Sequence, residues 1–235
     1  MGELLNVRSN CKPRQWLVFF VLWCGAATMA EAAETNSLVA AWLATQPRIQ
    51  TWEADFVQTR TLKSLLQPLT ATGHVWFAAP SRFRWELGHP AQTIAVRSAD
   101  ELLVIYPRLK RVERFPLSGG QTGPWRDALA LLEAGFPRSQ AELDSQYTIL
   151  SQTVSDHTCD LTLQPKSATA RRMVPQIKID FDTQDFLLRG TELQFADGST
   201  MRNDFQNEVL NPKIDEQQFS PLIPSDYKIV DPLKK

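Results

Sequence analysis

The sequence predicts a mainly β domain whose antiparallel sheet curls strongly or nearly closes. Two observations favour this fold class: hydrophobicity alternates with a period of two over many short segments, and turn-forming residues separate those segments. In Arg82–Leu87, the apolar residues Phe83, Trp85 and Leu87 alternate with charged ones, so they share one face of a strand. Many short strands joined by turns are typical of strongly curved antiparallel sheets.

The expected elements follow in chain order. A first helix runs from Asn36 to Gln46 and ends at Pro47, and a second runs from Trp125 to Gly135. The turn Ala196–Ser199 joins two strands, and the proline-containing tail after Pro212 is extended. The expected strands start around Trp52 and continue with Thr72–Phe77, Arg82–Leu87, Thr93–Arg97, Leu102–Tyr106, Arg111–Phe115, Tyr147–Val154, His157–Leu163, Ile177–Phe181, Leu187–Phe195 and Thr200–Val209.

Residues 1–32 have the pattern of a cleaved secretory signal peptide. A basic start with Arg8 and Arg14 precedes an apolar run over residues 16–27, and Ala30-Glu31-Ala32 fits a small-residue cleavage site. A membrane span needs about 20 apolar residues, so the run is too short to favour an anchor. Trp23 stands where lipid modification of Cys24 would need a small residue. We therefore expect export, and one mature domain over residues 33–235.

Composition and motifs favour a binding protein over an enzyme. The net charge of −1 argues against a nucleic-acid partner. The three histidines lack the spacing of a zinc site, and no nucleophile elbow or phosphate-binding loop is present. Cys159 lies in an apolar alternation and is expected to be a buried thiol.

Two polar segments have alternative interpretations. The Asp180-Phe181-Asp182 run with Asp185 could form a calcium site, although a polar turn between strands is favoured. Lys166–Arg172 could bind anionic lipid, although a solvated hairpin tip is favoured. For the apolar residues at alternating strand positions, periodicity alone favours an ordinary core over a ligand cavity.

An ordered set of motifs resembles the periplasmic outer-membrane lipoprotein carrier family (LolA-like). No single motif is specific, but the set covers nearly all of the mature chain in the family's order. It comprises Phe56-x-Gln58, Gly73-His74-Val75-Trp76-Phe77, Pro80-Ser81-Arg82-Phe83-Arg84-Trp85, Pro90-x-Gln92, Asp100–Tyr106 with Pro107, Lys110-Arg111-Val112, Phe205-x-Asn207, Asn211, Ile214-Asp215, Phe219, Pro224 and Tyr227.

The resemblance implies an incomplete antiparallel β-barrel whose helices form a lid over an apolar cavity for acyl chains. The cavity candidates are Phe56, Trp76, Phe83, Trp85, Leu87, Ile94, Val96, Val104, Tyr106, Phe181 and Phe195, and the lid candidates are Leu129, Leu132 and Phe136. It also implies a monomer without nucleotide, metal or other cofactor. Such a carrier receives lipoproteins from an inner-membrane ABC transporter complex and passes them to an outer-membrane acceptor.

One position departs from the family pattern. Many members have an arginine before the proline that corresponds to Pro80, where it is thought to hold the lid closed, and this chain has Ala79. A divergent paralogue with another apolar cargo is therefore an alternative. A sensor module that reads periplasmic lipoprotein on the same fold, and a secreted enzyme with a scattered active site, are the competing hypotheses.

Overall fold

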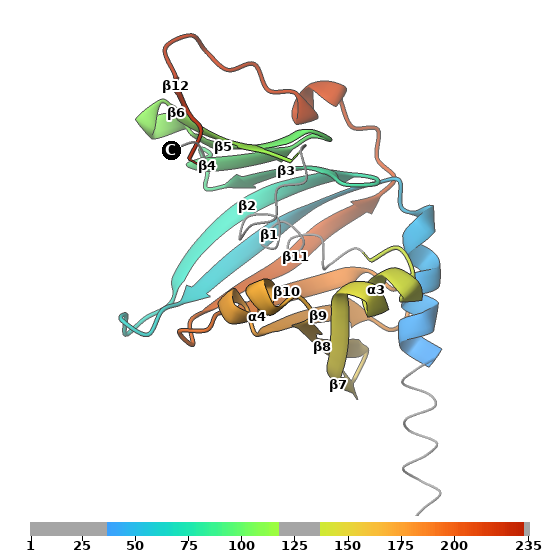
Figure 1. Cartoon of the computed structure of the whole chain (residues 1–235). Coiled ribbons are helices and arrows are strands. Elements are labelled where there is room, and N and C mark those ends of the chain that lie inside the picture. Colours follow the sequence, from blue (N-terminus) through green and yellow to red (C-terminus); the bar gives the residue numbers. More distant parts are fainter. Residues whose placement is uncertain (1–36, 118–136, 233–235) are drawn as a thin grey trace, which may run out of the picture.

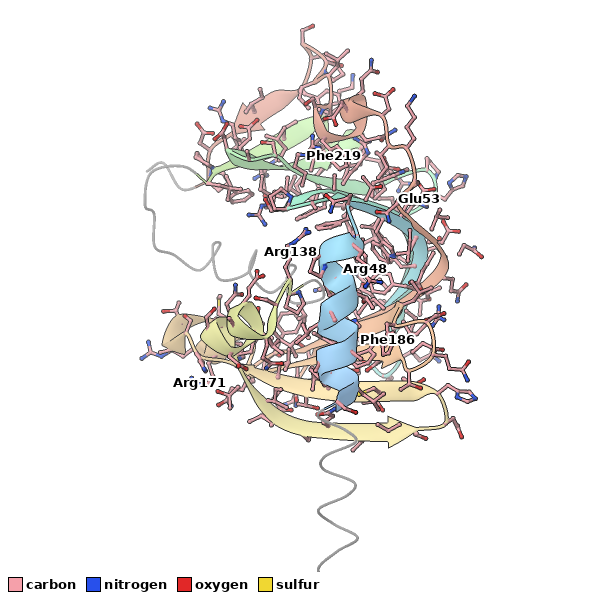
Figure 2. All side chains as sticks on the ribbon, turned by 90° about the vertical axis from the view of Figure 1, so that its right-hand side faces the viewer. Arg48, Glu53, Arg138, Arg171, Phe186 and Phe219 are labelled. Carbon is pink, nitrogen blue, oxygen red and sulfur yellow. The ribbon has the colours of Figure 1, made fainter. Side chains whose placement is uncertain are left out.

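The computed structural model describes residues 37–117 and 137–232, which form one twelve-stranded sheet that curves without closing (Figures 1 and 2). The strand order is β12-β6-β5-β4-β3-β2-β1-β11-β10-β9-β8-β7, and all neighbours are antiparallel except the pair β12 and β6. The predicted mainly β class and open antiparallel sheet are confirmed. The strands are β1 Thr51–Thr61, β2 Leu69–Ala78, β3 Arg82–Leu87, β4 Thr93–Arg97, β5 Glu101–Tyr106, β6 Arg111–Pro116, β7 Tyr147–Ser155, β8 Thr158–Pro165, β9 Gln176–Asp182, β10 Leu188–Gln194, β11 Thr200–Leu210 and β12 Lys228–Val230.

The helical elements are short. Residues 37–45 form the first helix, which continues into the 3-10 turn η1, Gln46–Arg48. Pro47 therefore tightens the last turn rather than ending the helix before it. Two further 3-10 turns are η2, Pro107–Leu109, and η3, Glu216–Phe219. Helices α3, Gln140–Gln146, and α4, Ala168–Met173, were not expected from the sequence.

The segment expected to be a solvated hairpin tip joins β8 to β9 and contains the short helix α4. Ser167 caps this helix by accepting a hydrogen bond from the Ala170 amide at 3.3 Å, and Ala170 is buried. Lys166–Arg172 connects the antiparallel strands β8 and β9 and is mostly exposed, as the favoured interpretation expected, but the sequence did not predict that it contains a helix. The basic side chains Arg171 and Arg172 remain exposed.

Two sequence predictions fall outside the described residues. The predicted signal peptide comprises residues 1–32, and the predicted lid helix with Leu129, Leu132 and Phe136 falls within residues 118–136. In the portions of the chain that the structure does describe, no helix combines the length and the apolar character needed to cross a bilayer.

Strand register divides the side chains between a concave inner face and a convex outer face. Across β2, β3 and β4, Val75 lies opposite Trp85, and Trp85 lies opposite Ala95, so these side chains share the inner face. One residue along, Trp76 lies opposite Arg84 on the outer face. Charged residues of β3 therefore point outward, as the alternation in Arg82–Leu87 predicts.

The inner face of β8–β10 is filled by helices. Trp42 of the first helix stacks on Phe181 of β9 with ring centroids 4.8 Å apart, and both side chains are fully buried. Leu143 of α3 and Ala170 of α4 are buried in the same half of the sheet. This half of the molecule is an ordinary close-packed core.

The C-terminal segment covers the outer face of β3–β6 (Figure 1). Arg82 of β3 forms an ion pair with Glu216 of η3, and its guanidinium lies 4.9 Å from the centroid of the Phe219 ring. Strand β12 then pairs in parallel with β6. The tail was expected to be extended, and β12 shows that its last part also joins the sheet.

The remaining polar expectations are met by local structure. Asp182 and Asp185 accept hydrogen bonds from the amides of Gln184 and Leu187, both at 2.8 Å, which is the polar turn that the sequence favoured over a calcium site. The hairpin turn Ala196–Ser199 is confirmed, with Gly198 at a φ of +81°. Cys159 is fully buried, as predicted, and burial raises the pKa of its thiol.

Candidate functional site

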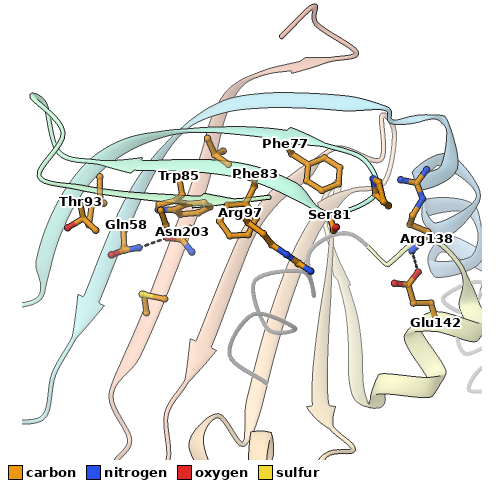
Figure 3. A pocket seen from close by; sticks show the side chains of 15 residues that line it. Gln58, Phe77, Ser81, Phe83, Trp85, Thr93, Arg97, Arg138, Glu142 and Asn203 are labelled. Carbon is orange, nitrogen blue, oxygen red and sulfur yellow. Dashed lines mark hydrogen bonds between the residues drawn. The ribbon is translucent and has the colours of Figure 1, made fainter. Parts of the chain in front are cut away.

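A cavity of about 470 Å³ opens on the inner face of β1–β4 and β11 (Figure 3). Most of its wall is apolar, with a few polar and charged residues toward the ends. Its lining consists of Gln58, Val75, Phe77, Pro80, Ser81, Phe83, Trp85, Leu87, Thr93, Ala95, Arg97, Arg138, Glu142, Met201 and Asn203. The cavity belongs to the part of the inner face next to the half that the helices fill.

An aromatic cluster forms the base of the cavity. The Trp85 ring, which lines the cavity, lies 4.1 Å from the Phe56 ring and 6.2 Å from the Phe205 ring, measured between centroids. The Phe56 ring packs directly over Gly73 of β2, where a Cβ atom would collide with it. A glycine at this position is therefore required for Phe56 to support Trp85 from behind.

A buried amide pair interrupts the apolar wall. The Gln58 side chain donates to the Asn203 carbonyl oxygen at 3.0 Å, and Asn203 donates to the Thr191 hydroxyl at 3.2 Å. Gln58 and Asn203 are only 7% and 4% exposed. Because the pair largely satisfies itself, it costs less to bury than isolated amides would, and it gives the cavity one polar spot.

Charged side chains occupy the other end of the cavity. Arg97 projects into it from β4, and burial lowers the pKa of this guanidinium. Near the first helix, the Arg138 amide donates to the Glu142 carboxylate at 2.9 Å, and the Arg138 guanidinium donates to the Pro47 carbonyl at 3.3 Å. These contacts fix α3 at the rim, where Ser139 caps it by accepting from the Glu142 amide at 3.1 Å.

The structure brings together only part of the predicted cavity set. Phe83, Trp85 and Leu87 line the cavity, and Phe56 is buried directly behind Trp85. Val104 is half-buried on the inner face of β5, opposite Ala95, and packs against the core. Tyr106 lies further along the same face, opposite Arg111, and does not line the cavity.

Three predicted residues lie on the wrong face. Trp76, Ile94 and Val96 point to the convex side, since Trp76 and Val96 both lie opposite Arg84 and Ile94 lies opposite Glu86. The physical reason is the period of two, because a shift of one residue moves a side chain to the other face. Val96 is buried there, on the side covered by the C-terminal segment.

Two other predicted residues belong to the filled half. Phe181 stacks on Trp42 in the packed core, and Phe195, at the end of β10, is partly buried against the same core. Neither lines the cavity. Apolar alternation identifies inward-facing residues but not which of them a helix will cover.

The prediction missed Val75, Phe77, Ala95 and Met201 as lining residues. The register of the hairpin between β2 and β3 would have identified Val75 and Phe77 as lining residues. This register sets Phe77 opposite Phe83 and Val75 opposite Trp85, so the charged alternation of β3 already excluded Trp76 from the inner face. Arg97 carried no comparable signal, because a charged residue at the end of a strand is expected to face solvent.

The described residues contain no group of three or more histidine, cysteine or acidic side chains positioned to hold a metal ion. The cavity is lined by apolar side chains, one amide pair and a few charged side chains. Such a site can enclose an apolar molecule and orient a polar group on it.

Comparison with known proteins identifies one family. The model of the outer membrane lipoprotein carrier protein LolA matches residues 48–221. The outer-membrane lipoprotein carrier protein of Chromohalobacter salexigens is 26% identical over 160 residues, which cover 68% of this chain and 70% of that protein.

Two solved structures that are similar to this chain at low sequence identity are the following. An uncharacterised conserved protein from Thermus thermophilus is 12% identical, and the superposition has a TM-score of 0.47. The match covers 86% of this chain and 99% of that protein. A LolA superfamily protein from Nitrosomonas europaea is 10% identical, and the superposition has a TM-score of 0.40. The match covers 78% of this chain and 96% of that protein.

Proposed function

The chain belongs to the outer membrane lipoprotein carrier (LolA) family, and on this premise we propose that it binds lipoprotein acyl chains, or a related lipid, in the cavity and ferries them from inner to outer membrane. Proteins of this family bind or transport cargo and are not enzymes. The observation that carries the proposal is the apolar cavity on the concave face of the sheet.

The size and the wall of the cavity support this function. Its volume of about 470 Å³ falls within the range of about 300–1,000 Å³ that is typical of small-molecule sites. Phe77, Phe83 and Trp85 supply large apolar surfaces with few hydrogen-bonding requirements. A wall of this kind accepts acyl chains of different length and saturation.

The energetics explain why such a cargo needs a carrier. Moving acyl chains out of a membrane into water costs about 0.8 kcal/mol per CH₂ group, so a lipoprotein cannot cross an aqueous compartment unprotected. A protein cavity replaces most of that lost contact during transit. Release at the acceptor then requires only that the acceptor offers a comparable apolar surface.

The cellular setting is part of the proposal. We expect the protein to act as a monomer in the periplasm after cleavage near Ala32, taking cargo from an inner-membrane ABC transporter complex and giving it to an outer-membrane acceptor. The substitution of Ala79 for the family's usual arginine favours, as a second candidate, a carrier of the same type with a different apolar cargo.

The test compares two tryptophans on opposite faces of one sheet. Trp85 lines the cavity and Trp76 faces outward, so Trp85→Gln removes cavity surface and Trp76→Gln is its matched control. We expect Trp85→Gln to weaken binding of a fluorescent acyl probe about tenfold, the factor expected for part of an aromatic contact. Trp76→Gln should bind as the wild type does.

Mass spectrometry of lipid extracted from the periplasmic protein identifies the cargo directly. Lipoprotein in the extract supports the carrier, and a different lipid supports the second candidate. Wild-type protein that neither contains lipid nor binds the probe would contradict both, and equal losses in the two folded variants would remove the cavity from the proposal.

A further inference from the structure

The hairpin between β1 and β2 ends in three exposed leucines. Leu65, Leu66 and Leu69, here called the leucine tip, are 44%, 105% and 51% exposed. Figure 1 shows this hairpin projecting beyond the rest of the sheet. A fully exposed leucine beside two half-exposed ones, at the end of a projection, is an unusual use of apolar surface in a soluble domain.

Local contacts hold the leucine tip away from the body of the protein. The Leu65 amide donates to the Leu62 carbonyl at 3.0 Å, which closes a turn, and Pro68 restricts the return of the chain into β2. On the neighbouring β10–β11 turn, a Cβ on Gly198 would come within 2.5 Å of Lys63 Cε, so the two turns lie side by side. The tip is therefore a formed structure that presents its leucines to the outside.

The charge around the leucine tip is positive. Residues 56–85 contain no aspartate or glutamate, and the exposed Arg60 and Lys63 flank the leucines. One acidic residue lies across the neighbouring turn. Hydrogen bonds from Ser199 lower the pKa of this residue, Asp197, and Lys63 adds to the effect. Exposed apolar side chains next to basic ones match the chemistry of an anionic lipid surface.

The leucine tip lies toward one end of the cavity. Figure 3 shows Gln58 and Thr93 at the cavity end opposite Arg138 and Glu142. Gln58 is on β1, and from there the strand runs outward through Arg60 to the tip. A surface that met the leucine tip would therefore meet the molecule on the Gln58 side of the cavity.

We propose that the leucine tip is a membrane-contact site, which inserts its leucines into the interface of a bilayer that contains anionic lipid. Arg60 and Lys63 contact the headgroups in this arrangement, and the Gln58 end of the cavity faces the bilayer. The site is separate from the cavity and does not depend on which cargo the cavity holds.

Vesicle flotation tests this site with a matched pair of leucines. The probe is vesicles of equal parts phosphatidylcholine and phosphatidylglycerol. Leu66→Ser alters the tip, and Leu222→Ser alters an equally exposed leucine, 97% exposed, in the C-terminal segment. We expect Leu66→Ser to lower the partition coefficient about tenfold, as the loss of one buried leucine predicts, and Leu222→Ser to leave it within about twofold.

Leu66 is fully exposed, so its replacement should not disturb folding, and a loss of binding reports on the surface itself. The proposal would be overturned if Leu66→Ser left the partition coefficient at the wild-type value. It would also be overturned if both variants lowered that coefficient equally. Failure of the wild type to bind pure lipid vesicles would also overturn it, in favour of a protein partner for the tip.

The cavity variant separates this proposal from the carrier function. Trp85→Gln should weaken acyl-probe binding and leave vesicle partition unchanged, because Trp85 lies in the cavity wall and not at the tip. If Trp85→Gln abolishes vesicle partition while Leu66→Ser does not, the cavity and not the tip contacts the membrane.

Discussion

The two halves of the inner face both carry large apolar side chains, but they differ in how the described helices pack against them. Over β8–β10, the apolar side chains are fully buried beneath the first helix and the short helices α3 and α4; they are Leu161, Leu163, Ile177, Ile179 and Phe181. Over β2–β4, Trp85, Leu87 and Ala95 are only half-buried and border the cavity.

The contrast shows that, among the described residues, the curved sheet forms a core where a helix lies in its curve and a cavity where none does. In the β8–β10 half, the Trp42 ring stacks on Phe181 and fills the space over the sheet. On the other side, the Gln58–Asn203 pair and Arg97 occupy positions that a packed core would give to apolar residues. We therefore expect equivalent substitutions in the two halves to have different consequences.

The largest expected effect is on stability in the filled half. Phe181→Ala should lower the free energy of unfolding by about 3–5 kcal/mol, because it leaves a cavity beneath Trp42 that the sheet cannot close. Leu87→Ala, at the cavity wall, should cost about 1 kcal/mol, since Leu87 is already half-exposed. Urea unfolding followed by circular dichroism measures both. Similar costs for the two variants would show that the halves are packed alike.

The sequence predicted the strands of this fold well, because each strand carries its own evidence. Strand β3 matches the predicted Arg82–Leu87 at both ends, and β4 matches Thr93–Arg97. The alternation of charged and apolar residues reports directly on the pleat, and turn residues mark the ends. Short helices that depend on tertiary contacts, such as α4, gave no periodic signal of comparable length.

The cavity was less predictable than the strands. Phe83 and Phe181 look alike in sequence, each an aromatic residue at an inward position of a strand, yet one borders the cavity and the other lies under Trp42. Which of them is covered depends on a helix far away in the chain, and no local pattern records it. The face of Trp76, in contrast, follows from hairpin register and was available from the sequence.

The next largest effect concerns access to the two halves. Cys159 is fully buried in the filled half, and Ala95 borders the cavity, so Ala95→Cys places a second thiol in the other half. We expect a small maleimide to label the introduced thiol at least about hundredfold faster, because Cys159 reacts only after a local opening that costs about 3 kcal/mol. Burial also raises the pKa of Cys159, which lowers its thiolate fraction at neutral pH.

Peptide mapping by mass spectrometry assigns the label to each thiol, which separates Cys159 and the introduced thiol from Cys11 and Cys24, and the unsubstituted protein provides the rate for Cys159 without the substitution. Comparable rates at the two positions would mean that the filled half opens as readily as the cavity, which would contradict the contrast. A bound acyl probe should slow labelling at position 95 and leave the rate at Cys159 unchanged.

The smallest expected effect concerns the balance between retention and release of cargo. Ala79 directly precedes Pro80 and Ser81, which line the cavity, and its amide donates to the Gln50 carbonyl at 2.8 Å. By the family resemblance, we expect an arginine side chain at this position to donate several hydrogen bonds to carbonyls of the predicted lid, which alanine cannot do. Those bonds would favour the closed state by about 1–3 kcal/mol if they are buried.

We expect a protein without this arginine to open more easily and to gain less free energy by closing again, so that it retains cargo more firmly than a relative that has the arginine. Ala79→Arg should therefore increase transfer of labelled cargo to acceptor vesicles severalfold. Arg97 already places one guanidinium in the cavity. The control is therefore Arg97→Gln, tested alone and combined with Ala79→Arg. If Arg97 already supplies the closing contact, Ala79→Arg will change transfer only when Arg97 is replaced. Unchanged transfer in both folded backgrounds would show that closure here does not depend on an arginine, and the carrier proposal would still rest on the family match and the cavity.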